Sequence, residues 1–213
     1  MRKIAVLFCF LLAAIGISQI VLRVLPAPAV ISDAKHYDDM AQVFLKEHWI
    51  PPAEDKGTGN PLIYPPGYAV FLSGVYAIFG HSYGVVRVLH FLLLGFSAYL
   101  VFLITNERLK LSFRWSLVAG GMILVWPYFI MQSLLLYPEI VFTTVLLLAM
   151  YYVLSFLEKE KATDLYIVSA LLAIGSLIRP NALLLNFWIL GCLWILKKGF
   201  LGEWRTFLKR GVI

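Results

Sequence analysis

Acidic side chains gather in one polar stretch, Ile31 to Gly67, of an otherwise apolar chain. Six of its twelve Asp and Glu residues and two of its four histidines lie there. Asp33 is the first candidate for chemistry, because a partly desolvated carboxylate can take a proton from an acceptor hydroxyl. The alternative for Asp33, which follows Ser32 at a predicted helix start, is an N-cap. If the protein is an enzyme, its active site is expected in this polar stretch.

Further polar groups follow Asp33 at helical spacing. His36 is one turn away, close enough to pair with Asp33 or to serve as an ordinary interfacial side chain. Asp38 and Asp39 could line a polar site or ligate a divalent cation, and a solvated helix face is the favoured interpretation for both. No group of His, Cys and carboxylates has the spacing of a zinc site. The sequence therefore assigns no certain cofactor, with a divalent cation as the alternative.

Three charged residues border or enter apolar runs. Glu139 begins such a run, where it either complements a helix N-terminus or supplies a second carboxylate to the same cavity as Asp33. Arg87 and Arg179 lie outside the basic clusters of the chain. An anionic partner such as a lipid phosphate would explain both arginines, and so would snorkelling to ordinary head groups.

Composition identifies the class of protein. With 61% hydrophobic and 14% charged residues, an ordinary soluble protein is excluded. The net charge of +6 comes from small basic clusters between apolar runs, which indicates membrane topology and no nucleic-acid partner. Cys9 and Cys192 lie within apolar runs and are interpreted as small apolar residues. The fold class is therefore an all-α polytopic membrane protein.

Six crossings are predicted in a single transmembrane domain, 1–213. The first, Ile4 to Leu22 within residues 4–25, approaches the roughly 20 residues that a hydrocarbon core requires. A signal peptide cleaved near Ala27-Pro28-Ala29 is the alternative. Residues 83–196 hold the other crossings, and 197–213 form a cytoplasmic tail. These five are expected at Tyr83 to Thr105, Trp115 to Ile130, Glu139 to Glu158, and the two parts of Leu165 to Leu196 divided at Arg179-Pro180.

Residues 26–82 are the predicted first extracytoplasmic loop. A helix is expected from about Ala34 to the residue before Pro51-Pro52, lying on the membrane surface. Its apolar side has helical spacing and consists of Tyr37, Met40, Ala41, Phe44, Leu45 and His48. Pro65-Pro66-Gly67 predicts an extended approach and a turn. Tyr68 to Phe79 is short for a crossing and predicts a re-entrant or interfacial helix.

The orientation follows from the basic residues. With the N-terminus in the cytoplasm and six crossings, the cytoplasmic segments carry twelve of the eighteen Lys and Arg residues. The polar stretch carries three of them against six acidic residues. The positive-inside rule therefore places the polar stretch on the extracytoplasmic face.

Short motifs occur in a fixed order along the chain. They are Asp33-Ala34-Lys35-His36-Tyr37, Tyr64-Pro65-Pro66-Gly67-Tyr68, Phe79-Gly80, Val86-Arg87-Val88, Tyr137-Pro138-Glu139 and Ile178-Arg179-Pro180-Asn181. This order resembles the N-terminal half of the GT-C membrane glycosyltransferases, in the branch of the protein O-mannosyltransferases and aminoarabinose lipid A transferases. That branch includes bacterial members described as dolichyl-phosphate-mannose-protein mannosyltransferases. Family members are generally longer, so the chain is expected to be an N-terminal part.

The resemblance implies a GT-C-like helical bundle in a bacterial-type inner membrane. It implies a polyprenyl-phosphate-linked sugar as donor and a protein, lipid or glycan as acceptor, with membrane lipids around the site. Asp33 and Glu139 would be its catalytic carboxylates. The implied donor-binding residues are His36, Tyr37, Tyr64, Pro66, Arg87 and Arg179. His36 and Tyr64 stand where the aminoarabinose branch has Arg and Lys, and Ala34 stands where many members have Glu.

The predicted function is transfer of a mannose-like hexose by direct displacement, with Asp33 activating the acceptor and cations stabilising the departing lipid phosphate. Two other classes stay open. One is a non-catalytic relative that binds polyprenyl phosphate or a partner subunit. The other is a small transporter, whose midplane polar groups would be Gln132, Asn181 and Asn186.

Overall fold

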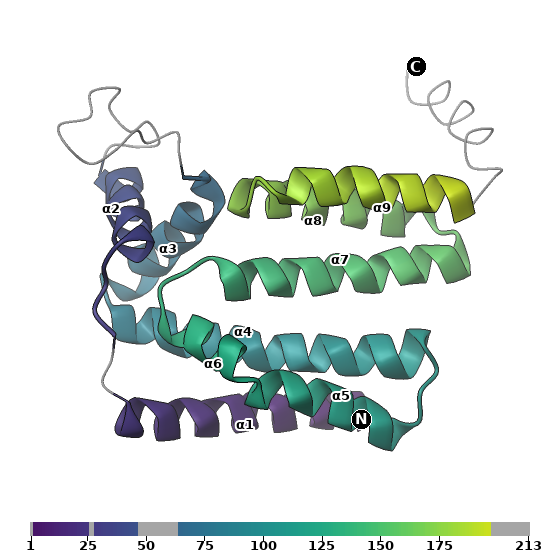
Figure 1. The fold of residues 1–213 in the computed structure, drawn as a ribbon, viewed down its shortest axis with the longest axis horizontal. Helices are drawn as coiled ribbons and strands as arrows, with labels where there is room; N and C mark the ends of the chain where they lie inside the picture. The colour runs from purple at the N-terminus through teal and green to yellow at the C-terminus, as the bar shows by residue number, and fades with distance from the viewer. Residues whose placement is uncertain (1, 26–27, 47–63, 197–213) are drawn as a thin grey trace, which may run out of the picture. The chain divides into compact units, whose positions relative to one another are not determined.

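The computed structural model describes residues 2–25, 28–46 and 64–196 (Figure 1). The chain divides into two compact units, residues 1–179 and residues 180–213, and each is described by itself. The described residues contain helices and no strand, which confirms the all-α fold class. The first unit contains α1 (Arg2–Val24), α2 (Asp33–Lys46), α3 (Pro66–Phe79), α4 (Tyr83–Leu103), a π-helical turn η1 (Ile104–Arg108), α5 (Phe113–Val125), α6 (Pro127–Leu134), α7 (Glu139–Lys159) and α8 (Ala162–Ile178). The second contains α9 (Ala182–Leu196).

Helix lengths support fewer crossings than the sequence predicts. Within the described ranges, three segments are long and apolar enough to cross a membrane: α1, Tyr83–Arg108 and α7. The pair α5 and α6 passes the same test together and would make a fourth. The helices α3, α8 and α9 are apolar but shorter. Three or four segments of the described residues therefore pass by length and composition, which marks the chain as an integral membrane protein and leaves the count of six unconfirmed.

The predicted crossing from Trp115 to Ile130 is not one straight helix. It is broken at Trp126, and α5 and α6 are bent by 49° relative to each other. Pro127 is the physical cause, because a proline disfavours helical backbone in the residue before it and has no N–H to donate. Trp126 accordingly has extended backbone, with φ −71° and ψ 118°.

The long helices of the first unit lie side by side, with α4 in contact with α1, α5 and α7 (Figure 1). Two glycines allow α4 and its neighbours to approach closely. A Cβ at Gly95 would lie 3.0 Å from the Cβ of Ala14, and one at Gly120 would lie 2.6 Å from the carbonyl oxygen of Ala98. Small residues at such contacts let helix backbones pack tightly in membranes.

The helices α2 and α3 occupy one end of this unit, where α1 ends and α4 and α7 begin (Figure 1). The predicted turn at Pro65-Pro66-Gly67 leads directly into α3, whose first residue is Pro66. A Cβ at Gly67 would lie 2.7 Å from the backbone carbonyl of Leu177, near the end of α8. Glycine is needed there because the start of α3 packs on the α8 backbone.

The amphipathic helix of the polar stretch is present as α2, and its buried side contacts α3. Tyr37, Ala41 and Phe44 are buried, as the sequence predicts. Two details are wrong: Leu45 is 39% exposed, and Asp38, interpreted as part of a solvated face, is only 3% exposed. Predictions for His48 and for Pro51-Pro52 fall outside the described residues.

Candidate active site

Asp33 is the first residue of α2, and its side chain is exposed. Tyr64, immediately before the Pro65-Pro66 pair, donates its hydroxyl to Oδ1 of Asp33 at 3.0 Å. The carboxylate also complements the positive end of the helix dipole. This contact holds a solvent-accessible carboxylate in a fixed direction, which is the arrangement that a general base requires.

An aromatic cluster fixes Tyr64 in turn. Its ring stacks on His36 with centroids 4.9 Å apart, and it meets the edge of Tyr37 at 5.4 Å. Tyr37 packs edge-on against Tyr68 at 5.1 Å, and the Tyr68 hydroxyl lies 3.1 Å from Nε2 of His90 on α4. The predicted residues His36, Tyr37 and Tyr64 are therefore neighbours, and a continuous set of rings joins them to the bundle.

Glu139 and Arg179 form an ion pair at the start of α7 and just after α8. The pKa of the Tyr37 phenol is raised to about 12, mainly by burial and next by the negative charge of Glu139. The charges of Arg179 and Asp33 also act on this phenol. Tyr37 thus stays protonated and lies within electrostatic range of both predicted carboxylates. The structure brings Asp33, Tyr37, Glu139 and Arg179 to the same end of the first unit.

The Glu139–Arg179 pair has capacity for a further ligand. Oε2 of Glu139 is buried and has no hydrogen-bond partner in the described part of the chain. The Arg179 side chain is 41% exposed. An unfilled acceptor next to an accessible guanidinium can receive a hydroxyl and an anion side by side.

Arg87 has a different environment from the one expected of a snorkelling residue. It is buried in α4, and its guanidinium donates to the carbonyl oxygens of Leu134 at 2.9 Å and Pro28 at 2.7 Å. Arg87 thus ties the end of α6 and the segment before α2 to α4. Its contact with a donor phosphate stays a prediction.

Asp38, for which the sequence favoured a solvated helix face, is instead buried in a cluster of hydrogen-bond donors. Oδ1 accepts hydrogen bonds from the Tyr76 hydroxyl at 2.6 Å and from His81 Nε2 at 2.9 Å. Oδ2 accepts from the Tyr83 hydroxyl at 2.8 Å and from Gln42 Nε2 at 3.1 Å. Burial would raise the pKa of Asp38, but these hydrogen bonds outweigh burial and hold the pKa below its ordinary value.

A signal for this burial was present in the sequence. Position 38 is four residues after Ala34 and three before Ala41, so it lies on the apolar side of α2. Asp39 faces away, is half-exposed and pairs with Lys35 at 3.3 Å, as a solvated face predicts. Among the described residues, no group of three or more His, Cys, Asp or Glu side chains is placed to hold a metal ion.

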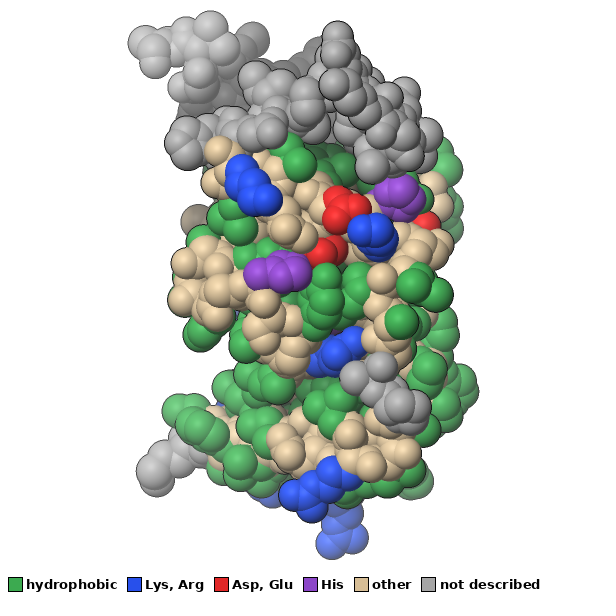
Figure 2. Space-filling view, turned by 90° about the vertical axis from the view of Figure 1, so that its left-hand side faces the viewer, with side chains coloured by type: hydrophobic (Ala, Val, Ile, Leu, Met, Phe, Trp, Pro, Cys, Tyr) green, Lys and Arg blue, Asp and Glu red, His purple; other side chains and the backbone are tan. Residues whose placement is uncertain are grey.

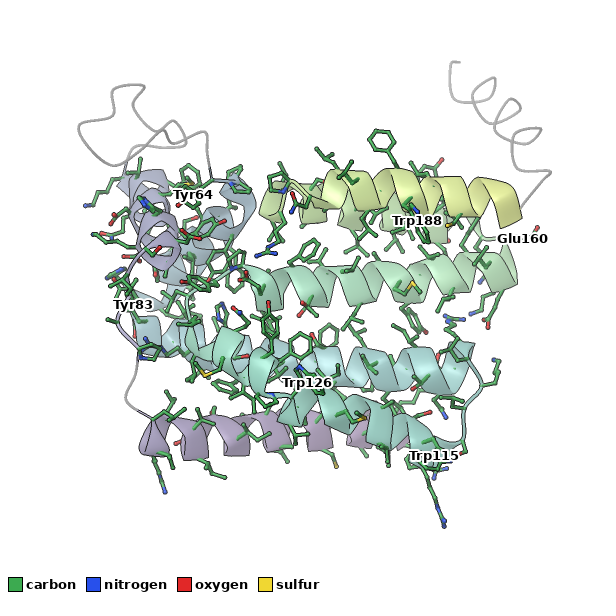
Figure 3. The ribbon with its side chains drawn as sticks, in the orientation of Figure 1. Tyr64, Tyr83, Trp115, Trp126, Glu160 and Trp188 are labelled. Carbon is green, nitrogen blue, oxygen red and sulfur yellow. The ribbon has the colours of Figure 1, made fainter. Side chains whose placement is uncertain are left out.

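Figures 2 and 3 show this end of the first unit. Acidic and histidine side chains lie among hydrophobic ones, with Lys or Arg side chains beside them (Figure 2). Tyr64 and Tyr83 lie at the same end, close to α2 and α3 (Figure 3). Charged, histidine and hydrophobic side chains therefore lie together at this end of the first unit.

Residues 64–210 match the family model of the dolichyl-phosphate-mannose-protein mannosyltransferases. The chain belongs to this family. No curated protein and no solved structure matches the chain. Membership confirms the resemblance inferred from the motif order, and this family indicates a membrane glycosyltransferase of the mannosyltransferase type.

The family match covers one part of the candidate site. Tyr64, Pro66, Arg87, Glu139 and Arg179 lie within the matched residues. The helix α2, which carries Asp33, His36 and Tyr37, precedes them. Its contribution to a mannosyltransferase site therefore depends on the contacts of Asp33 and Tyr37 described above.

Proposed function

We propose that the protein transfers a mannose-like hexose from a polyprenyl-phosphate carrier to a protein, lipid or glycan acceptor at the extracytoplasmic face of the membrane. One observation carries the proposal. The exposed Asp33 carboxylate, held by Tyr64, lies at the same end of the first unit as the Glu139–Arg179 pair. A base and an anion-binding cation are the two groups that a displacement on a sugar phosphate needs.

The proposed reaction is a single displacement. The acceptor hydroxyl oxygen forms a bond to the anomeric carbon while the bond from that carbon to the phosphate oxygen breaks. The hydroxyl proton passes to Asp33, and Arg179 stabilises the lipid phosphate as its negative charge grows. Glu139 orients Arg179 through their ion pair. One displacement inverts the configuration at the anomeric carbon.

The far end of the first unit supports the proposed orientation. There Lys3 pairs with Glu107, and Arg108 pairs with Glu158 at 2.7 Å. The same end carries Arg2, Lys110, Arg114, Lys159 and Lys161. A basic end opposite the candidate site fits a cytoplasmic N-terminus in a bacterial-type inner membrane.

Six spans stay part of this proposal. The helix α8 has 17 residues. At ~1.5 Å per residue it would be somewhat shorter than a hydrocarbon core of ~30 Å. Local thinning of the bilayer accommodates such a short segment. The bent pair α5 and α6 and the helix α9 would supply two more crossings.

The test is transfer by purified protein in nanodiscs, with radiolabelled polyprenyl-phosphate mannose and acceptors of each class. Asp33→Asn keeps the size of the side chain and removes the base, so the rate should fall by roughly 10²- to 10⁴-fold. Asp39→Asn is the matched control, because Asp39 is on the same helix and faces Lys35. Unchanged transfer by Asp33→Asn would remove the proposed role of Asp33. Donor binding without turnover by the wild type would identify a non-catalytic relative.

A further inference from the structure

We propose that Asp38 is a positioning residue that locks α2 against the start of α4 and thereby sets the orientation of Asp33. The proposal rests on the proposed function, because it gives Asp38 a task in the same site. Asp38 itself lies about 1.4 helical turns from Asp33 and has its own set of partners, so it acts through the helix and not on the substrate.

The partners of Asp38 come from α2, from α3, from the turn after α3 and from the start of α4. Gln42 is on α2, Tyr76 is on α3, His81 is in the turn between α3 and α4, and Tyr83 is the first residue of α4. Each carboxylate oxygen accepts two hydrogen bonds. The carboxylate thus connects three consecutive elements at one point.

Packing alone does not require a carboxylate at this position. Asp38 is 3% exposed, and an ionised group at such a position is costly unless its oxygens are hydrogen-bonded. An apolar side chain of similar size would fill the contact between α2 and α3 without that cost. The carboxylate adds direction, because its three hydrogen bonds from Tyr76, His81 and Tyr83, which lie outside α2, restrict both the rotation and the tilt of the helix.

The partners also distinguish this cluster from a cation site. Tyr76, Tyr83 and Gln42 present O–H and N–H groups to Asp38. These groups donate hydrogen bonds, so they stabilise a carboxylate and occupy its oxygens in place of a metal ion. The Tyr76 and Tyr83 rings also pack edge-on against His81, at 4.7 Å and 4.9 Å, and hold the turn in place.

The link to the candidate active site is mechanical. Asp33 and Asp38 are on one 14-residue helix, five positions apart, which is about 7.5 Å along the axis. A tilt of α2 about its contact with α3 would move its first residue relative to Tyr64 and Glu139. Misplacement of a catalytic group by about 1 Å can lower the rate by on the order of 10²-fold.

The experiment compares Asp38→Asn with Asp39→Asn, the same substitution one residue later. Cys9 and Cys192 are first replaced by Ala, and spin labels are attached at exposed positions on α2 and α4, through Lys35→Cys and Val88→Cys. The distance distribution between the labels is measured in nanodiscs by double electron–electron resonance. The kcat and KM values for sugar transfer are measured on the same variants without labels.

We expect a broader distance distribution for Asp38→Asn than for the wild type and Asp39→Asn. We also expect kcat to fall by about 10- to 100-fold with KM changed less than about 3-fold, because the substrate contacts are retained while the base is misplaced. A distribution as narrow as that of Asp39→Asn would overturn the proposal. A broader distribution with unchanged kcat would also overturn it, since Asp33 would then not depend on Asp38.

A second variant and the independence of the distance measurement from turnover make the result interpretable. Tyr83→Phe removes one of the four hydrogen bonds and retains the ring, so it replaces Asp38→Asn if that variant does not fold, and it should broaden the distribution less. The spin-label arm requires no turnover. If the wild type transfers no sugar, the proposed function fails, while the label distances still decide whether Asp38 positions α2.

Discussion

The phenolic hydroxyl of Tyr64 donates a hydrogen bond to the Asp33 carboxylate at 3.0 Å, across 31 positions of the sequence. The contact joins the first residue of α2 to the residue before the Pro65-Pro66 turn. It therefore links the one candidate base of α2 to the segment where the family match begins.

The first prediction concerns this contact. Tyr64→Phe keeps the ring that stacks on His36 and removes the hydroxyl, so Asp33 should become less well oriented. Because Asp33 is exposed, we expect a moderate fall in kcat, on the order of tenfold. Transfer kinetics in nanodiscs provide the measurement. Tyr128→Phe, an exposed tyrosine on α6, is the control and should behave as wild type.

Gly67 and Gly74 give a matched pair on α3. A Cβ at Gly67 would lie 2.7 Å from backbone atoms of Leu177, whereas a Cβ at Gly74 would meet nothing within 4 Å. Gly67→Ala should therefore destabilise the protein by ~1–3 kcal/mol. Gly74→Ala should stabilise it by ~0.5–1 kcal/mol through the higher helix propensity of alanine. Thermal unfolding in detergent measures both, and equal melting temperatures would contradict the packing of α3 on α8.

Substitution of Arg179 should change the KM for the donor more than the KM for the acceptor. If its guanidinium binds the lipid phosphate, Arg179→Ala should raise the KM for the donor by roughly tenfold or more, and Arg179→Lys should restore part of the loss because it retains the charge. Separate titrations of donor and acceptor give the two KM values. A change confined to the acceptor KM would exclude phosphate binding by Arg179.

Ionisation of Asp38 should make the stability of the folded protein depend on pH in the acid range. Its pKa in the folded protein is below the ordinary value of 3.8, so its contribution to stability is complete above that value and is lost as pH falls through the lowered pKa. We expect the melting temperature of the wild type to fall more steeply below about pH 4 than that of Asp38→Asn. Parallel curves for the two proteins would show that the carboxylate has no such effect.

Topology is tested with single cysteines in a background without Cys9 and Cys192. Lys35→Cys on α2 should react with a membrane-impermeant maleimide in intact cells, and Lys110→Cys should react only after the cells are permeabilised. The reverse pattern would place the candidate site in the cytoplasm and end the proposed use of an extracytoplasmic donor.

Sequence patterns predicted the helices better than their interactions. The spacing of Tyr37, Ala41 and Phe44 was enough to predict α2, because one-sided burial follows directly from helical periodicity. The number of spans was less accessible, because Pro127 divides a run that composition treats as continuous. Helical spacing places Asp38 on the apolar face of α2, but its partners could not be predicted, because Tyr76, His81 and Tyr83 are about forty positions away.

For the candidate site too, the sequence predicted which residues take part better than it predicted their contacts. The motif order indicated Asp33, Glu139 and Arg179, and the structure brings them to one end of the first unit. The contact of Tyr64 with Asp33 was not predicted, because 17 residues outside the described part of the chain, 47–63, separate Tyr64 from α2. Local residue preferences do not specify contacts between residues so far apart in the sequence.

The two backbone carbonyls that Arg87 holds have a consequence for biosynthesis. Pro28 leaves the ribosome long before Leu134, and the guanidinium needs both. A nascent chain that has not reached Leu134 carries Arg87 in an apolar helix with only the Pro28 carbonyl as acceptor. Arg87 therefore gains its second carbonyl acceptor only after α6 has been made, so the contact that ties α6 to α4 forms later than the one to Pro28.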